Sequence, residues 1–240
     1  IYQQLRQAGY TDDRIILIVE DDIADNVSNP NKGVIQVTVG GNNVYENVEI
    51  DYRMSSLKAK DILAILNGEK SETLPTVIES TENDNLFVFW SGHGVPGAMC
   101  WDEEPYAMTG DDLSTVFKDM NLKRRYRKLL MMVESCFSGG VMEQCEGIPG
   151  MLFITAANGD ETSKADVFNG EMKVWMSNRF TSTFIEQITD NKDVAMRDLY
   201  YRLFINTVGS HVMVYNAENY GNLYSADMSE FINFKNDKSK

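Results

Sequence analysis

The chain has 240 residues, a formal net charge of −14, and hydrophobic and charged fractions of 43% and 24%. These fractions are typical of globular proteins and exclude an intrinsically disordered chain, and the length is compatible with one α/β domain. The negative charge argues against nucleic acids and anionic membranes as partners, because both repel an acidic protein.

Cysteine count and apolar runs exclude further classes. Cys100, Cys136 and Cys145 show no C-x-x-C spacing, so neither a disulfide framework nor a metal site is expected. Apolar runs such as residues 86–90 and 129–133 are far shorter than the roughly 18 residues that a membrane-spanning helix needs. No membrane segment is therefore predicted.

The first part of the chain is expected to contain both helices and strands. Residues 2–9 are typical of a helix end closed by glycine, and the β-branched and apolar run 14–19 is typical of a strand buried on both faces. A small hairpin is predicted over residues 34–45. A helix capped by one of two serines, Ser55 or Ser56, is expected to end at residue 67.

The rest of the chain repeats this alternation. Further buried strands are predicted at residues 85–90, 128–133 and 151–157, and helices at residues 111–121, 175–189 and 193–207. Strands that alternate with helices indicate an α/β protein, here a three-layer αβα sandwich with a mostly parallel central sheet. We expect a single domain over residues 1–240.

Two of the predicted strands are each followed by a short loop with a reactive side chain. His93 lies in Ser-Gly-His-Gly, and Cys136 lies in Glu-Ser-Cys-Phe-Ser-Gly-Gly. Because the carboxyl ends of parallel strands meet at one edge of a sheet, the two side chains are expected to lie close together. A thiolate attacks carbonyl groups, and an imidazole can accept the thiol proton, so the pair predicts nucleophilic catalysis.

The backbone amides of Gly94 and Cys136 are the predicted donors to the oxyanion of such a reaction. A lone cysteine after a buried strand is more often an inert core residue, and a lone histidine between glycines is no more informative. The matched positions of His93 and Cys136 at two strand ends favour the catalytic interpretation.

Longer segments around these residues resemble the legumain (asparaginyl endopeptidase, C13) family of cysteine peptidases. Residues 87–94, 131–140 and 209–215 carry the resemblance in the family's order, and residues 21–52 are also similar. The resemblance implies a caspase-like fold. It also implies cleavage of peptide or protein substrates after asparagine, and more weakly after aspartate, through a thioester on Cys136 and without a cofactor.

The family's substrate pocket corresponds to Glu134, Thr162, Ser163 and, less closely, Glu171 of this chain. Carboxylates and hydroxyls there could accept hydrogen bonds from the side-chain amide of asparagine. A solvated loop carboxylate is the alternative for Glu171. His211 lies in a segment that is structural in the family, so we expect a hydrogen-bonded core or loop histidine rather than a second base.

Departures from the family pattern keep other functions open. Gly92 stands where many eukaryotic legumains have aspartate, and in this respect the chain is similar to GPI transamidase, which passes the acyl group to an amine. A non-catalytic caspase-fold binding module is a further alternative.

The family's first strand, with a pocket arginine and an asparagine that orients the catalytic histidine, should precede Ile1. We therefore expect an incomplete pocket, an unpaired sheet position, and a separate N-terminal light chain from self-cleavage of a zymogen, with a truncated chain as the alternative. Because relatives work outside the cytosol, an extracytoplasmic location (periplasmic, secreted or vesicular) is expected.

Overall fold

Apolar runs in the middle of the chain form the centre of the fold. The structure is a computed structural model and describes residues 1–100, 107–190 and 193–234. The central sheet consists of β3 (Asn85–Ser91), β7 (Lys128–Glu134), β8 (Met151–Thr155) and β11 (Met213–Tyr215), in the order β11-β8-β7-β3. The first three strands are parallel, and β11 is antiparallel to β8. The predicted mostly parallel sheet is thus confirmed.

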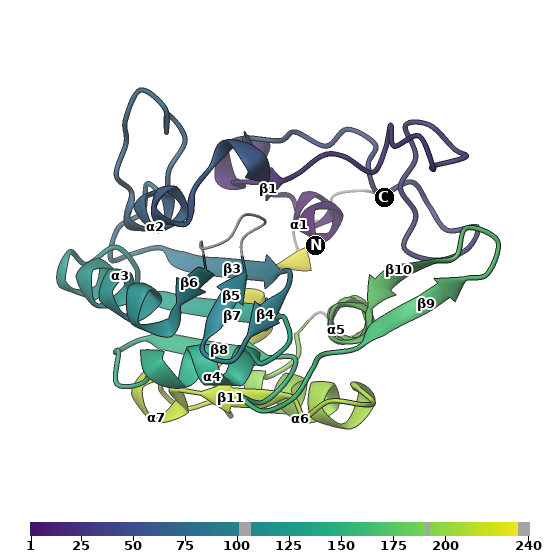
Figure 1. Cartoon of the computed structure of the whole chain (residues 1–240). Helices are drawn as coiled ribbons and strands as arrows, with labels where there is room; N and C mark the ends of the chain where they lie inside the picture. Colours follow the sequence, from purple (N-terminus) through teal and green to yellow (C-terminus); the bar gives the residue numbers. More distant parts are fainter. Residues whose placement is uncertain (101–106, 191–192, 235–240) are drawn as a thin grey trace.

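Helices cover both faces of this sheet (Figure 1). They are α1 (Tyr2–Gln7), α2 (Ala59–Asn67), α3 (Gly110–Leu122), α4 (Ser138–Met142), α5 (Arg179–Asp190), α6 (Met196–Asn206) and α7 (Ala217–Tyr220). Side chains of β7 alternate between two apolar clusters: Leu129, Met131 and Val133 pack with α2 and α3, whereas Leu130 and Met132 pack with α5 and α6. The three-layer αβα sandwich is therefore confirmed. None of the described helices is long and apolar enough to cross a membrane.

Shorter elements surround the sandwich. They are β1 (Ile18–Val19), β2 (Tyr52–Arg53), β4 (Gly94–Val95), β5 (Ala98–Cys100), β6 (Ala107–Thr109), β9 (Ala165–Asn169), β10 (Val174–Asn178), and the 3-10 helices Asp12–Arg14, Met54–Ser56, Glu143–Cys145 and Met228–Glu230. β1 and β2 are parallel, β4 to β6 form an antiparallel sheet, and β9 and β10 form a hairpin. In Figure 1 this hairpin extends to the right of the central sheet.

Several predictions of local structure are wrong in detail. The run 14–19 is a strand only at Ile18–Val19. Residues 34–45 form turns instead of paired strands, because side chains bind the backbone; Asn43 Oδ1, for example, accepts the Ile35 N–H at 3.0 Å. The helix predicted from residue 175 begins at Arg179, and α2 begins at Ala59, after the two serines.

One edge of the central sheet is open. Among the described residues β3 pairs only with β7, and a cavity of about 1410 Å³ lies along it. Residues 14–19 also line this cavity, so β1 and β3 face each other across it (Figure 1). Side chains of β3 are only partly buried, whereas nearly all those of β7 are buried. The sheet therefore has an unpaired position beside β3.

Candidate active site

The loops that carry His93 and Cys136 leave the sheet side by side. In the register of β3 and β7, Ser91 lies opposite Glu134, so both strands end at the same level. The Gly92 N–H donates to the Glu134 carbonyl oxygen at 3.1 Å and continues the pairing beyond the strands. His93 and Cys136 each follow two residues after the last paired position.

Gly94 is in direct contact with the turn that carries Cys136. A β-carbon at Gly94 would overlap the Cys136 carbonyl oxygen and the Ser135 hydroxyl, so only glycine lets the two loops approach this closely. His93 is exposed, and its carbonyl oxygen accepts the Cys100 N–H at 2.9 Å, which joins the histidine loop to β5. The histidine loop thus lies against the turn of the predicted nucleophile.

The turn after β7 holds Cys136 in a half-buried position. The next residue, Phe137, has φ 55° and ψ 18°, a left-handed conformation that is uncommon for a residue with a side chain. Its N–H donates to the Glu161 carbonyl oxygen at 2.8 Å, and the Gly139 N–H donates to the Ala157 carbonyl oxygen at 3.1 Å. Such strained residues persist where surrounding contacts hold them, and they cluster at active sites.

Glu134 is a buried carboxylate near the thiol, only 2% exposed. Its Oε2 accepts the Thr181 N–H and hydroxyl at 2.9 and 3.1 Å, whereas its Oε1 has no hydrogen-bond partner among the described residues. Burial raises the pKa of Glu134, and the hydrogen bonds from Thr181, together with the nearby Ser163 hydroxyl and Phe180 amide, offset part of that rise. Ser163 Oγ lies 3.8 Å from Cys136 Sγ. The thiol, this hydroxyl and the buried carboxylate are therefore neighbours.

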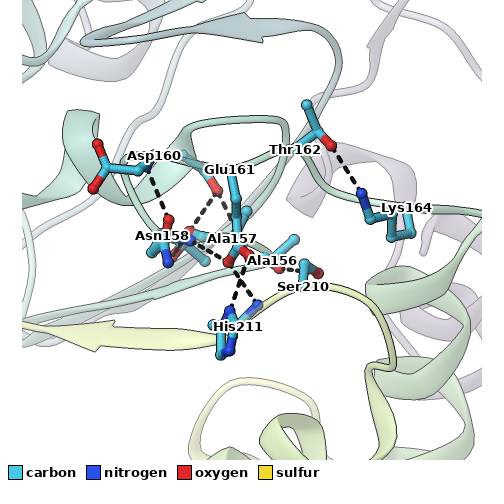
Figure 2. Close-up of polar contacts among 11 residues, drawn as sticks. Ala156, Ala157, Asn158, Asp160, Glu161, Thr162, Lys164, Ser210 and His211 are labelled. Atoms are coloured by element: carbon cyan, nitrogen blue, oxygen red, sulfur yellow. Dashed lines mark hydrogen bonds and ion pairs between the residues drawn. The ribbon is translucent and has the colours of Figure 1, made fainter.

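The other two predicted pocket residues are placed differently. Thr162 is exposed, and its hydroxyl accepts a hydrogen bond from Lys164 Nζ at 2.9 Å (Figure 2). Glu171 is exposed in the turn between β9 and β10, where its N–H donates to Asn169 Oδ1 at 3.0 Å. No described hydrogen bond or ion pair joins Glu171 to the thiol or to Glu134, so its pocket role stays a prediction.

Two residues near the site, Thr181 and Glu161, were missed from the sequence. Thr181 binds Glu134 across 47 residues of chain, and this contact depends on how α5 packs against β7. Glu161 belongs to the same segment as Thr162, and its carboxylate binds His211, which is a hydrogen-bonded loop histidine as predicted. Proximity to Thr162 could have indicated Glu161, whereas no spacing signal indicates Thr181.

Comparison with known proteins decides the family. The family model described as "Peptidase C13 family" matches residues 1–231. The chain belongs to this C13 family. Legumain from Rattus norvegicus is 29% identical over 221 residues, which cover 89% of this chain and 50% of that protein. The vacuolar-processing enzyme of Vicia sativa is 36% identical over 168 residues, 68% of this chain and 34% of that protein. The C13 chain thus spans about half or less of the length of these curated relatives.

The fold of this C13 family member is similar to that of caspases. Caspase-1 from Spodoptera frugiperda superposes with a TM-score of 0.51 at 11% sequence identity, over 94% of this chain and 91% of that chain. A likeness at this identity concerns the fold alone. It confirms the caspase-like α/β fold that the sequence resemblance implied.

Proposed function

We propose that this C13 family member is a cysteine endopeptidase that cleaves peptide and protein substrates after asparagine, and more weakly after aspartate. The observation that carries the proposal is the unpaired Oε1 of buried Glu134, close to Ser163 and Cys136. Burying an acceptor without a hydrogen-bond partner costs free energy, so a functional reason for the unpaired oxygen is expected. The NH₂ group of an asparagine side chain would supply the missing hydrogen bond.

The proposed reaction begins with Cys136. His93 accepts the thiol proton, the sulfur attacks the carbonyl carbon of the scissile bond, and the backbone N–H groups of Gly94 and Cys136 donate to the resulting oxyanion. His93 then gives its proton to the leaving amine as the C–N bond breaks, which leaves a thioester on Cys136. Water attacks the thioester while His93 accepts one of its protons, and that proton returns to the thiolate when the product acid leaves. The contact between Gly94 and the Cys136 turn supports these shared roles.

Charge separates asparagine from aspartate in this proposal. An aspartate carboxylate would approach the carboxylate of Glu134, and like charges at short range repel. Protonation of either group removes the repulsion, and burial, which raises the pKa of Glu134, favours its protonated form. Turnover after aspartate is therefore expected to increase as the pH falls.

Fluorogenic peptides that differ only at P1, as Asn, Asp, Ala or Arg, test this function. We expect the fastest turnover with Asn, and none from the Cys136→Ala variant, which lacks only the sulfur atom. Turnover with a different P1 residue would keep the nucleophile and contradict the pocket. Acyl transfer to an added amine in place of hydrolysis would indicate the transamidase alternative. Failure of a thiol-directed peptide inhibitor to label Cys136 would indicate a binding module.

The proposal includes one further β-strand beside β3, which would complete a single peptidase domain. This strand would belong to a separate N-terminal light chain released by self-cleavage. The cavity is lined by apolar residues of both facing strands, including Ile18, Val19, Phe87 and Phe89. An added strand would pair with the free edge of β3 and remove an exposed edge that invites aggregation. Intact-mass analysis of the folded native protein should show a second chain. A spectrum with this chain alone would contradict the two-chain arrangement.

We also propose an extracytoplasmic setting, which the name of the Vicia sativa relative, a vacuolar-processing enzyme, supports. Residues Asn26-Val27-Ser28 form an N-glycosylation sequon, which is exposed; Val27 within it is 93% exposed. A mobility shift on endoglycosidase treatment of the native protein would support a secretory route. Recovery of the protein in the cytosolic fraction alone would contradict it.

A further inference from the structure

A set of hydrogen bonds centred on Glu161 joins two segments near the candidate site. Its Oε1 accepts the N–H groups of Asn158 and His211 at 3.1 and 2.7 Å, and its Oε2 lies 2.9 Å from His211 Nδ1. Figure 2 shows the two side chains facing each other, Glu161 from the loop after β8 and His211 from the segment before β11. Because a carboxylate only accepts, Nδ1 carries the proton in this contact.

Glu161 also binds the nucleophile turn through its backbone. Its carbonyl oxygen accepts the Phe137 N–H at 2.8 Å. Phe137 directly follows Cys136 and has the left-handed φ of 55°, a conformation that persists only when neighbouring groups hold it. A shift of Glu161 would therefore move or release the turn that carries the thiol.

Glu161 is also close in the chain to a proposed pocket residue. Ser163 follows two residues later, and its hydroxyl lies 3.8 Å from Cys136 Sγ. The side chain of His211 is 66% exposed and that of Glu161 is 23% exposed. The His211 ring is thus not needed to fill the core. Its main described contact is the hydrogen bond with Glu161.

We propose that Glu161 and His211 form a positioning clasp, which holds Ser163 and the Cys136 turn in the geometry that binds substrate. The inference rests on the proposed peptidase function and deepens it, because it names residues that control substrate binding without touching the substrate. Burial disfavours the ionised form of Glu161, but the hydrogen bonds from His211 and Asn158 outweigh this and lower the pKa of Glu161. The clasp is therefore built around an ionised carboxylate.

Substitutions at His211 separate a positioning role from a general structural one. His211→Ala removes the ring and leaves the backbone N–H contact with Glu161. An asparagine side chain can place its NH₂ close to the former position of Nδ1, so His211→Asn keeps a donor. Since His211 is exposed, both variants are expected to fold. Glu82→Gln, which alters the exposed ion pair between Glu82 and Arg124, is a matched control far from these contacts.

Kinetics with the P1 Asn peptide give the first readout. We expect His211→Ala to raise KM roughly fivefold, the scale of one ordinary hydrogen bond, with a smaller change in kcat. His211→Asn should recover most of the loss, and the control should match the parent protein. An unchanged KM in His211→Ala, or an equal loss in the Ala and Asn variants, would overturn the clasp.

Hydrogen exchange of the full chain, followed by mass spectrometry, tests the clasp without a substrate. His211→Ala should speed exchange in peptides that contain the Phe137 and Asn158 amides, both of which donate to Glu161. Exchange across residues 129–133 of β7 should stay unchanged. Unchanged exchange at both amides overturns the clasp whether or not the protein hydrolyses peptides. Faster exchange in a protein that cleaves none of the peptides supports the clasp and refutes the proposed function.

Discussion

The central sheet has a closed half and an open half, and the candidate site lies at their boundary. In the closed half, β7 and β8 are paired along both edges and their side chains are almost all buried. In the open half, β3 is paired along one edge and borders the cavity. Cys136 and Glu134 extend from the closed half, whereas His93 and Gly94 extend from the open half. Cys136 therefore follows a strand that is paired along both edges, whereas His93, its proposed base, follows a strand that is paired along one edge.

The largest expected difference between the halves is the cost of removing an aromatic ring. Phe153 of β8 is fully buried and its ring lies 5.6 Å from that of Phe117, so Phe153→Ala should lower the free energy of unfolding by roughly 3 to 5 kcal/mol. Phe89 of β3 is partly buried and stacks on Phe184 at 6.2 Å. Phe89→Ala should cost about half as much or less, because less apolar area leaves water on folding. Urea denaturation measures both, and equal losses would contradict an open half.

Thiol reactivity sharpens the same comparison. Burial in the apolar cluster that packs against β7 and β8 raises the pKa of Cys145 from 9.0 to about 12, which lowers its thiolate fraction roughly a thousandfold. Cys136 and Cys100 are only partly buried. Iodoacetamide at pH 8 should therefore modify these two in the folded protein and leave Cys145 unmodified, as read by peptide mass spectrometry. All three should react in urea, and rapid labelling of Cys145 without urea would contradict its burial.

The difference between the halves also explains which parts of the fold could be predicted. β7 was predicted almost to its bounds because its continuous apolar run has one stable solution, a strand buried on both faces. The hairpin of β9 and β10 was missed because most side chains of both strands are partly or fully exposed. The pairing of Phe168 with Trp175 is a cross-strand contact that has no helical or alternating signature. The pattern of apolar residues in the sequence therefore predicts strands well where burial is uniform, and poorly where the strands are exposed.

Some features of the candidate site could likewise be predicted from the sequence, and others could not. The adjacent positions of the loops that carry His93 and Cys136 could be predicted, because the ends of neighbouring parallel strands lie together, a rule that needs only the order of the strands. The contact of Glu161 with His211 spans 50 residues, and one carboxylate among 36 acidic residues carries no local signal. Thr181 depends in addition on the packing of α5. Loops at neighbouring strand ends follow from topology, whereas the side chains that hold those loops follow from tertiary packing.

Glu134 gives the last and smallest expected effect on stability. Because burial raises its pKa above the ordinary 4.5, the unfolded chain loses this proton at a lower pH than the folded protein does. Stability should therefore fall as the pH rises from 4.5 through the folded-state pKa, and stay lower above it. Glu134→Gln removes this ionisation and should raise the free energy of unfolding at neutral pH by about 1 kcal/mol, an ordinary size for a single substitution.

The same substitution should damage selectivity, because a carboxamide that keeps its oxygen toward Thr181 turns an NH₂ toward the position of Oε1 and meets the substrate's NH₂ with a second donor. We expect kcat/KM for P1 Asn to fall by roughly 10- to 100-fold, the range for a lost hydrogen bond that leaves polar groups unpaired. Iodoacetamide should still modify Cys136 at the parent rate, since the thiol keeps its neighbours. Higher stability combined with lower Asn selectivity would show that Glu134 is kept in the closed half for binding, at the expense of folding. Lower stability at neutral pH would instead make the carboxylate a structural partner of Thr181 and remove the main support for an asparagine pocket.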